Sequence, residues 1–474
     1  MEAVLLLIRR LNDRILWGMP MVILMTGTGV FLTGITRGKL FRKFPTVLRY
    51  TAGTLLRNAG EPESTAGSIT PFQAVCTALA ATVGTGNIVG VALAIATGGP
   101  GAIFWLWVSA LAGMAIKYSE VTLAQAYRTV SGSGKTVGGP MYYIRRGMGQ
   151  KIPAVLFAAF AVLASLGIGA SVQANALAGG ITAAFGTNSR IIGLVTAGLS
   201  AMILIGGIRR IAGIAEFLVP FMSILYIGGC LAALAVNITE IPGALALIFK
   251  SAFTGSAAMG GFAGASVRQA CRIGMARGVF THEAGMGSAP IAHASAATDH
   301  PARQGLWGSF EVFFDSIVLC SVTALVILTS GLWQDPLLAA EPRTLSAAAL
   351  GSAFPGGQYI VTLGICLFAF ATIIAWYYYG ETCMAYLTRD SGFAVMVYRI
   401  AYVAMVYAGC VISMDTVWEI SDFFNALMAI PNLAALIALS PVIRALTDDF
   451  FSDPHTIRPK GTVFDCITGH KVRK

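Results

Sequence analysis

Residues 80–88 read AATVGTGNI, and two glycines interrupt what is otherwise a continuous apolar segment over 71–97. Glycine costs roughly 1 kcal/mol against alanine in a helix, and in lipid an unwound turn leaves backbone groups that no water can satisfy. Irregular backbone therefore survives in a membrane only where it lines an enclosed cavity or binds something. A second glycine-broken stretch, TGSAAMGG, covers residues 254–261. For one such motif alone, close packing of helices is the simpler interpretation.

The composition around these stretches is that of a membrane protein. Hydrophobic residues make up 56% of the 474 positions and charged residues 11%, whereas a soluble protein carries about 25% charged residues. Apolar runs of membrane-spanning length recur along the chain. We predict an all-α integral membrane protein with about eleven transmembrane helices, over 15–35, 71–97, 100–128, 152–185, 190–206, 212–236, 243–263, 305–331, 357–387, 392–410 and 416–446.

The two glycine-broken stretches occupy corresponding positions. Each lies in the first helix of a set of five, and because five is odd the second set is inverted in the membrane relative to the first. Such a pair is the best sequence indication of a secondary transporter built from inverted repeats, with its site at the two breaks. The predicted organisation is an extra N-terminal helix with a basic loop (1–70), a first repeat (71–236), a second repeat (243–447) and a tail (448–474).

The net charge of +10 comes from Lys and Arg that gather on alternate loops. One side of the predicted membrane collects the basic segments 37–57, 128–151, 209–210 and 268–303, together with the tail. The positive-inside rule makes that side cytoplasmic, which places the N-terminus outside and the C-terminus inside. Membrane topology thus explains the charge, and we expect no nucleic-acid partner and no obligate protein partner.

Motifs typical of enzymes are incomplete. Gly134-Lys135-Thr136 lacks the earlier glycine of a phosphate-binding loop, since position 129 is Thr, and His282-Glu283 lacks the second histidine of a zinc protease motif. His293 and His300, with Asp299 nearby, are interpreted as a solvated cytoplasmic segment and not as a metal site. We therefore predict a protein that is not an enzyme and uses no organic cofactor.

Ionisable residues inside apolar spans are costly and usually face a cavity or a partner. Glu311 and Asp315 are four residues apart, on one helical face, and are candidates for a proton relay. The alternative is a structural role beside the Arg-rich cytoplasmic loops.

Four segments carry a resemblance to a known family: 77–105 (TALAATVGTGNIVGVALAIATGGPGAIFW), 131–149 (SGSGKTVGGPMYYIRRGMG), 251–270 (SAFTGSAAMGGFAGASVRQA) and 277–305 (RGVFTHEAGMGSAPIAHASAATDHPARQG). Over roughly 10–450 the chain resembles the alanine or glycine:cation symporters, sodium-coupled carriers of bacterial and archaeal plasma membranes. That family has the leucine-transporter-like fold of the amino acid-polyamine-organocation superfamily. The resemblance implies sodium-coupled uptake of alanine or glycine, D-alanine included, by alternating access.

The resemblance also implies which residues bind the substrate. The first unwound turn would offer backbone N–H groups to the carboxylate, and Asn87 an amide oxygen to the amine or a cation. The second break would offer carbonyl groups and a hydroxyl to the ammonium, with aromatic and methionine walls, while Trp376 would exclude larger side chains. The full set is Gly84, Thr85, Gly86, Asn87, Gln173, Phe253, Thr254, Ser256, Met259, Thr372 and Trp376.

Sodium in this fold is usually held between the first broken helix and the ninth span. By resemblance the ligands are the carbonyls of Ala80, Val83 and Ala369 and the hydroxyl of Thr372. A neutral, all-oxygen site suits a hard monovalent cation.

Three other functions remain to be distinguished. Proton-coupled uptake through Glu311 or Asp315 would persist without sodium. An ion channel would not show saturable uptake, and a membrane enzyme would need a paired nucleophile and base.

Overall fold

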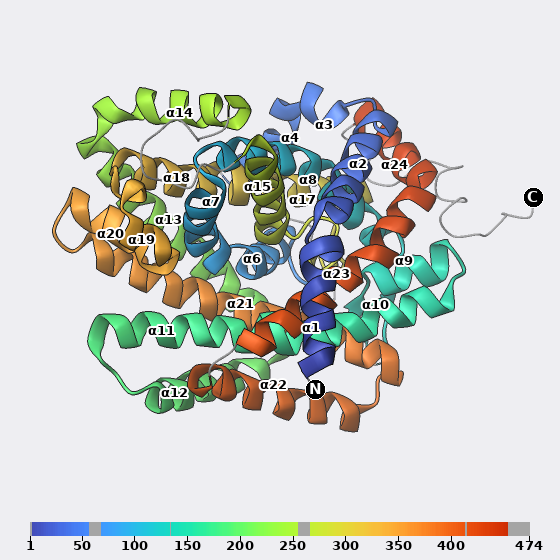
Figure 1. The fold of residues 1–474 in the computed structure, drawn as a ribbon. Helices are drawn as coiled ribbons and strands as arrows, with labels where there is room; N and C mark the ends of the chain where they lie inside the picture. The colour runs from blue at the N-terminus through green and yellow to red at the C-terminus, as the bar shows by residue number, and fades with distance from the viewer. Residues whose placement is uncertain (1, 56–67, 133, 255–265, 413–414, 454–474) are drawn as a thin grey trace, which may run out of the picture.

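The computed structural model describes residues 2–55, 68–132, 134–254, 266–412 and 415–453. These residues form a helical bundle in which a two-stranded hairpin, β1 (Thr129–Val130) and β2 (Thr136–Val137), is the one described sheet. In Figure 1, α6, α7 and α15 lie in the middle of the bundle, with α11, α12 and α22 along one side. Helices therefore enclose the first glycine break on all sides.

Most predicted spans are confirmed as helices. Eight helices are long and apolar enough to cross a membrane, and the bent pair around residues 83–85 would be a ninth. Two further elements, the 16-residue α12 and the interrupted α15 and α16, would bring the count to the predicted eleven. In the first half the elements are α1 (Glu2–Leu11), η1 (Asn12–Leu16), α2 (Met19–Ile35), α3 (Lys39–Arg42), α4 (Phe44–Tyr50), α5 (Ala52–Leu55), α6 (Pro71–Thr82), η2 (Gly86–Gly90), α7 (Val91–Gly98), α8 (Gly101–Ala126), α9 (Pro140–Gly147), α10 (Lys151–Ala164), η3 (Ser165–Val172), α11 (Gln173–Phe185), α12 (Ser189–Leu204) and α13 (Gly207–Val236).

The second half contains a similar series. Its elements are η4 (Ile238–Glu240), α14 (Ile241–Thr254), α15 (Val267–His282), α16 (Ala289–His293), α17 (Pro301–Val312), η6 (Phe313–Leu319), α18 (Cys320–Thr329), η7 (Leu332–Gln334), α19 (Pro336–Ala340), α20 (Pro342–Ala353), α21 (Gly357–Thr388), α22 (Gly392–Val411), α23 (Asp415–Ala438) and α24 (Ser440–Ser452).

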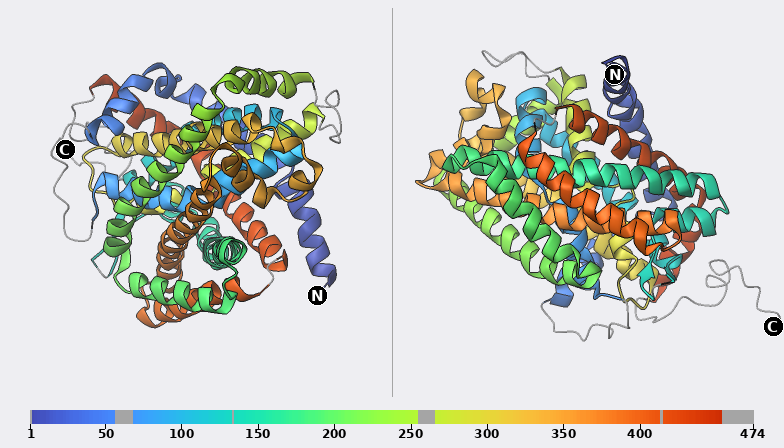
Figure 2. Two further views of the ribbon diagram at one scale, coloured as in Figure 1. Left: turned by 90° about the vertical axis from the view of Figure 1, so that its left-hand side faces the viewer. Right: turned by 90° about the horizontal axis from the view of Figure 1, so that it is seen from below.

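The seventh predicted span, 243–263, is described only as far as Thr254. This part is helical, as α14 (Ile241–Thr254), and the rest of the predicted span lies outside the described residues. Figure 2 (left) shows α14, in yellow-green, at the outer edge of the bundle. The predicted cytoplasmic loop over 264–304 instead contains α15, which packs along α8 and α7 near the centre. If the second repeat begins with its broken helix, as the first does, it begins at α15.

Three segments of π-helix face the centre of the bundle. The first, η2, follows the first break, while η3 leads into α11 and η6 joins α17 to α18. Contacts join η2 to η6 and η3 to α21. Single π-helical turns inside α-helices commonly mark functional sites, so these segments are candidates for one.

Candidate substrate and cation site

The first break separates α6 from the helix formed by η2 and α7, and the two helix axes are bent relative to each other. After α6 ends at Thr82, Val83 is extended (φ −75°, ψ 90°), and the axes on either side of the break differ by 52°. The last carbonyls of α6 and the first N–H groups of η2 therefore meet at residues 83–86. A carbonyl end suits a cation and an N–H end suits an anion, so one break can hold both.

Close packing explains why the break needs glycine. A Cβ atom at Gly86 would lie 2.9 Å from the Thr281 methyl carbon of α15. One at Gly84 would lie 3.2 Å from the Thr372 hydroxyl oxygen of α21. The missing side chains let helices from the second half of the chain approach the unwound backbone.

The predicted cation ligands are partly brought together. The Thr372 hydroxyl lies 3.0 Å from the carbonyl oxygen of Ala80 and 2.9 Å from that of Phe368 in its own helix. Val83 and Ala369 are both fully buried, at the end of α6 and one turn before Thr372 on α21. The α6 terminus and α21 thus supply neutral oxygens to one buried corner.

Two predicted substrate residues from separate elements also meet. The Thr85 hydroxyl donates to the Gln173 side-chain oxygen at 3.4 Å, and the Gln173 amide nitrogen donates to the carbonyl of Ile168 at 3.3 Å. The exposed fractions of the Thr85 and Gln173 side chains are only 7% and 6%. This polar pair beside the break can orient a small polar ligand.

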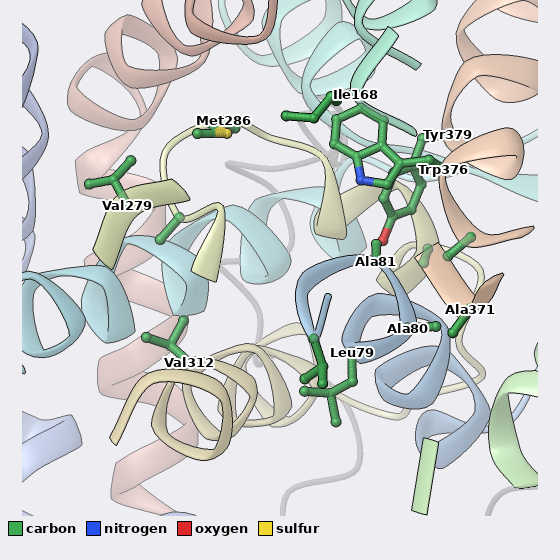
Figure 3. Close-up of a cluster of buried hydrophobic side chains, with 14 of the residues drawn as sticks. Leu79, Ala80, Ala81, Ile168, Val279, Met286, Val312, Ala371, Trp376 and Tyr379 are labelled. Carbon is green, nitrogen blue, oxygen red and sulfur yellow. The ribbon is translucent and has the colours of Figure 1, made fainter. Parts of the chain in front are cut away.

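Trp376 closes the same region from α21. A Cβ atom at Gly169 would lie 2.5 Å from the Trp376 Cβ, so the indole packs directly on η3. Figure 3 shows Trp376 and Tyr379 reaching toward Ala81 at the end of α6, with Ile168 beside the indole. That Trp376 closes a substrate site stays a prediction.

Two residues of the predicted second break, Phe253 and Thr254, are the last described residues of α14. Phe253 is 60% exposed on α14, where its ring packs on Phe104 at a centroid distance of 5.0 Å. The Thr254 hydroxyl donates back to the Lys250 carbonyl at 2.7 Å. Ser256 and Met259 lie outside the described residues.

A glycine break that the sequence analysis did not predict lies at residues 283–288, between α15 and α16, and is called the second break from here on. Gly285 (φ +95°) and Gly287 (φ +79°) adopt conformations that favour glycine, and Glu283 (φ +50°) is left-handed without being glycine. The Glu120 carboxylate of α8 accepts hydrogen bonds from the N–H groups of Gly285 and Gly287 at 3.0 and 3.1 Å. Asn432 of α23 donates to the same carboxylate and to the Gly285 carbonyl. The break is therefore held from two helices.

Asn87 has a different role from the predicted one. Its side-chain oxygen accepts the Gly84 N–H at 3.0 Å, and its amide nitrogen donates to the Asp315 carboxylate at 2.6 Å. One of the N–H groups expected to bind substrate is therefore already used. Asn87 shapes the first break and ties it to η6.

Glu311 and Asp315 do not form a pair. Glu311 forms an ion pair with the Lys117 ammonium and a hydrogen bond with the His293 ring nitrogen, both at 3.3 Å. Asp315 accepts from Asn87 and from the Ser316 hydroxyl, which are neutral donors. The two carboxylates therefore have different hydrogen-bond partners. The alternative interpretation gave Glu311 a structural role beside cytoplasmic arginines. Its ion-pair partner is Lys117 and not an arginine.

The histidines of residues 293–300 are buried, which corrects the expectation of a solvated segment. His293 and His300 both have 0% exposure. Burial lowers the pKa of His300, which caps α17 through the N–H of Ala302. Among the described residues no group of three His, Cys, Asp or Glu side chains could hold a metal ion.

Sequence reasoning missed the contribution of α15. Phe280 and Thr281 face Gly86, and Glu283 accepts from the Trp376 indole N–H at 3.2 Å. The available signal was the run EAGMGS at 283–288, which has two glycines at its centre. It lies in a polar stretch and was therefore interpreted as a loop.

A comparison with protein families matches residues 1–461 to the sodium:alanine symporter family. The chain is 44% identical to the sodium/alanine symporter AgcS of Methanococcus maripaludis, over 92% of this chain and 94% of that protein. It is likewise 44% identical to an uncharacterised transporter of Haemophilus influenzae (93% and 94% covered). It is 40% identical to the probable sodium/glutamine symporter GlnT of Bacillus subtilis (93% and 89%).

Among solved structures, the fold is similar to that of MhsT in complex with L-phenylalanine. The TM-score is 0.55 at 13% identity, over 83% of this chain and 93% of that one. At this identity the likeness shows the fold alone. It confirms the predicted leucine-transporter-like architecture.

Proposed function

Because the chain belongs to the sodium:alanine symporter family, whose members are multi-pass membrane transporters and not enzymes, we propose that it imports a small neutral amino acid with sodium by alternating access. The proposed substrates are alanine and glycine, including D-alanine. Sodium is the proposed coupling ion, and we expect no organic cofactor.

The observation that carries the proposal is the oxygen-lined corner at the end of α6. The Ala80 carbonyl and Thr372 hydroxyl oxygens lie 3.0 Å apart, beside the carbonyl end of a broken helix, and both are neutral. Neutral oxygens and a helix C-terminus favour a hard monovalent cation. We assign Ala80, Val83, Ala369 and Thr372 as its ligands.

The substrate would lie next to this corner. Gly84, Thr85, Gly86 and Gln173 surround it with backbone and side-chain polar groups, and Asn87 holds the turn in shape. The contact of Trp376 with Gly169 supports a small substrate, because an indole packed on η3 leaves no space for a long substrate side chain. Relatives named for alanine and for glutamine make substrate size the property to test first.

The burial of the site fits alternating access. Thr85, Asn87, Gln173 and Thr372 are each at most 7% exposed, so a substrate bound among them would be sealed from both sides. Release then requires movement at the breaks. One sodium ion crossing about 100 mV gains about 2.3 kcal/mol, and a tenfold gradient adds about 1.4, enough for roughly 500-fold accumulation.

We further propose that the protein resides in the plasma membrane with its N-terminus outside and its C-terminus in the cytoplasm. The distribution of Lys and Arg among the loops supports this orientation. If α15 is a central helix, Arg268 and Arg272 at its start lie on the outer side of the membrane and not on the cytoplasmic side. The excess of Lys and Arg on the cytoplasmic side then comes from the other basic loops.

Proton coupling is the second candidate, and Asp315 is its best residue. Asp315 is fully buried next to the first break, and its hydrogen-bond donors among the described residues, Asn87 and Ser316, are neutral, whereas Glu311 is paired with Lys117. A proton on Asp315 would neutralise its buried carboxylate. In this candidate the proton takes the place of the sodium ion as the coupling ion.

Uptake into proteoliposomes separates the two candidates. Purified protein is supplied with labelled L-alanine under an inward sodium gradient or a matched potassium gradient, and glycine and leucine are added as competitors. Uptake that requires sodium and is blocked by glycine but not by leucine would support the proposal. Uptake that ignores sodium and collapses with the pH gradient would favour Asp315 and protons.

A further inference from the structure

Glu283 is a buried carboxylate at the second break, beside the proposed substrate site. Its left-handed conformation (φ +50°) turns the residue away from the path of α15, and its exposed fraction is 6%. One carboxylate oxygen accepts from the Trp376 indole N–H at 3.2 Å, and the other accepts from the Ser288 hydroxyl. Both donors are neutral.

The Glu283 carboxylate differs from the other buried glutamates in what balances it. Glu311 pairs with the ammonium of Lys117, and Glu120 accepts two backbone N–H groups and the Asn432 amide. Glu283 forms no ion pair within 4.0 Å in the described parts of the chain; the Lys117 ammonium, which pairs with Glu311, acts on it only from a greater distance. Burying an ionised carboxylate is costly unless a cation or several donors compensate it. Glu283 is therefore suited to receive a cation from a ligand.

The geometry of α21 places this carboxylate near the first break. Thr372 and Trp376 are four residues apart and so share one helical face, about 6 Å apart along the axis. Thr372 contacts Ala80 and faces Gly84 of the first break, while Trp376 contacts Glu283 of the second. The same face of α21 thus contacts both breaks. An α-amino acid carries its ammonium and its carboxylate on one carbon, so its two binding groups must be about this close.

We propose that the Glu283 carboxylate binds the α-ammonium group of the transported amino acid, while the N–H groups of the first break bind the substrate carboxylate. This inference rests on the proposed function and names the recognition chemistry within it. The bound ammonium completes the charge balance of Glu283 and leaves its bond to Trp376 in place. The site would then select zwitterions with a free α-ammonium and reject α-hydroxy acids of the same shape.

The test compares L-alanine with L-lactate, which has a hydroxyl in place of the ammonium. Binding is measured on the full-length purified protein in saturating sodium, as displacement of labelled L-alanine by each compound. The variants are Glu283→Gln, which removes the charge, and Glu283→Asp, which keeps it. Glu381→Gln is the matched control, because Glu381 is a nearly buried glutamate on α21 whose ion partner is Arg399 at 3.7 Å.

Glu283→Gln is expected to weaken L-alanine binding by about tenfold or more, the size of one charge-assisted hydrogen bond, and to leave L-lactate affinity within about twofold. The preference for alanine over lactate falls by the same factor. Glu283→Asp should retain most of that preference, and Glu381→Gln all of it.

Two outcomes would overturn the inference. Undiminished alanine affinity in Glu283→Gln would do so, and so would an equal loss for alanine and lactate, which indicates a structural role. Sodium-driven alanine uptake by the unmodified protein is measured in parallel. If that uptake is present, either outcome removes only the role of Glu283, whereas its absence across a panel of α-amino acids overturns the proposed function as well.

Discussion

The Thr372 hydroxyl on α21 meets the carbonyl oxygen of Ala80 on α6 at 3.0 Å, across 292 positions of the sequence. This contact joins the broken helix of the first half of the chain to a long helix of the second. A cation bound there would strengthen the connection, and its departure would weaken it. Ion binding can thus favour one arrangement of the two helices over another.

Removing the Thr372 hydroxyl should weaken sodium coupling. For Thr372→Ala we expect the apparent sodium affinity in alanine uptake to fall about tenfold, since one of few oxygen ligands is lost. Thr372→Ser keeps the oxygen and should stay within about threefold of the unmodified protein. Uptake measured over a range of sodium concentrations provides the comparison, and equal sodium affinity in all three proteins would exclude Thr372 as a ligand.

Shortening Trp376 should widen substrate selection. In Trp376→Ala the space of the indole becomes free, so valine and leucine should begin to compete with labelled alanine. Trp376→Phe keeps a ring and should admit less. Because both variants also lose the indole N–H that binds Glu283, their alanine affinity should fall in parallel. Exclusion of leucine by both variants would show that other residues set the size limit.

A methyl group at Gly86 should block the site through Thr281. Gly86→Ala brings a Cβ to 2.9 Å from the Thr281 methyl carbon, which costs about 1–3 kcal/mol if the neighbour cannot move. We expect a lower melting temperature and little uptake. The double variant with Thr281→Ser, which deletes that methyl, should recover both. Gly90→Ala is the control, because its Cβ would meet nothing within 4 Å.

The buried pair of Lys117 and Glu311 should behave as a unit. Lys117→Met leaves Glu311 with only His293 and is expected to destabilise the protein by about 3–5 kcal/mol. Lys117→Met combined with Glu311→Gln should be less destabilised than Lys117→Met alone. Thermal unfolding in detergent measures both, and simple addition of the two single effects would contradict the coupling.

Several parts of the structure were predictable from local sequence. Composition and the lengths of apolar runs indicated a membrane bundle, since few charges are tolerated in lipid. The first break was evident because glycines interrupt an apolar segment that would otherwise be a regular helix. The family resemblance led to Gln173, Thr372 and Trp376, which do lie around that break.

The tertiary structure was needed for the second break. Both 254–261 and 283–288 contain glycines, and the apolar surroundings favoured the first of them. Contacts from remote helices identify 283–288 as a break, because Glu120 of α8 and Asn432 of α23 satisfy its N–H and C=O groups.

The sequence by itself therefore determined the membrane class, the helical pattern and the broken helix in the first half, because these depend on hydrophobicity and glycine content within one segment. Only the tertiary structure decided that Glu311 pairs with Lys117, that Asn87 shapes its own turn, and that Glu283 accepts hydrogen bonds from Trp376 and Ser288. These are properties of pairs. A buried charge takes its role from whichever group lies within hydrogen-bond distance, and that distance is set by helices remote in the sequence.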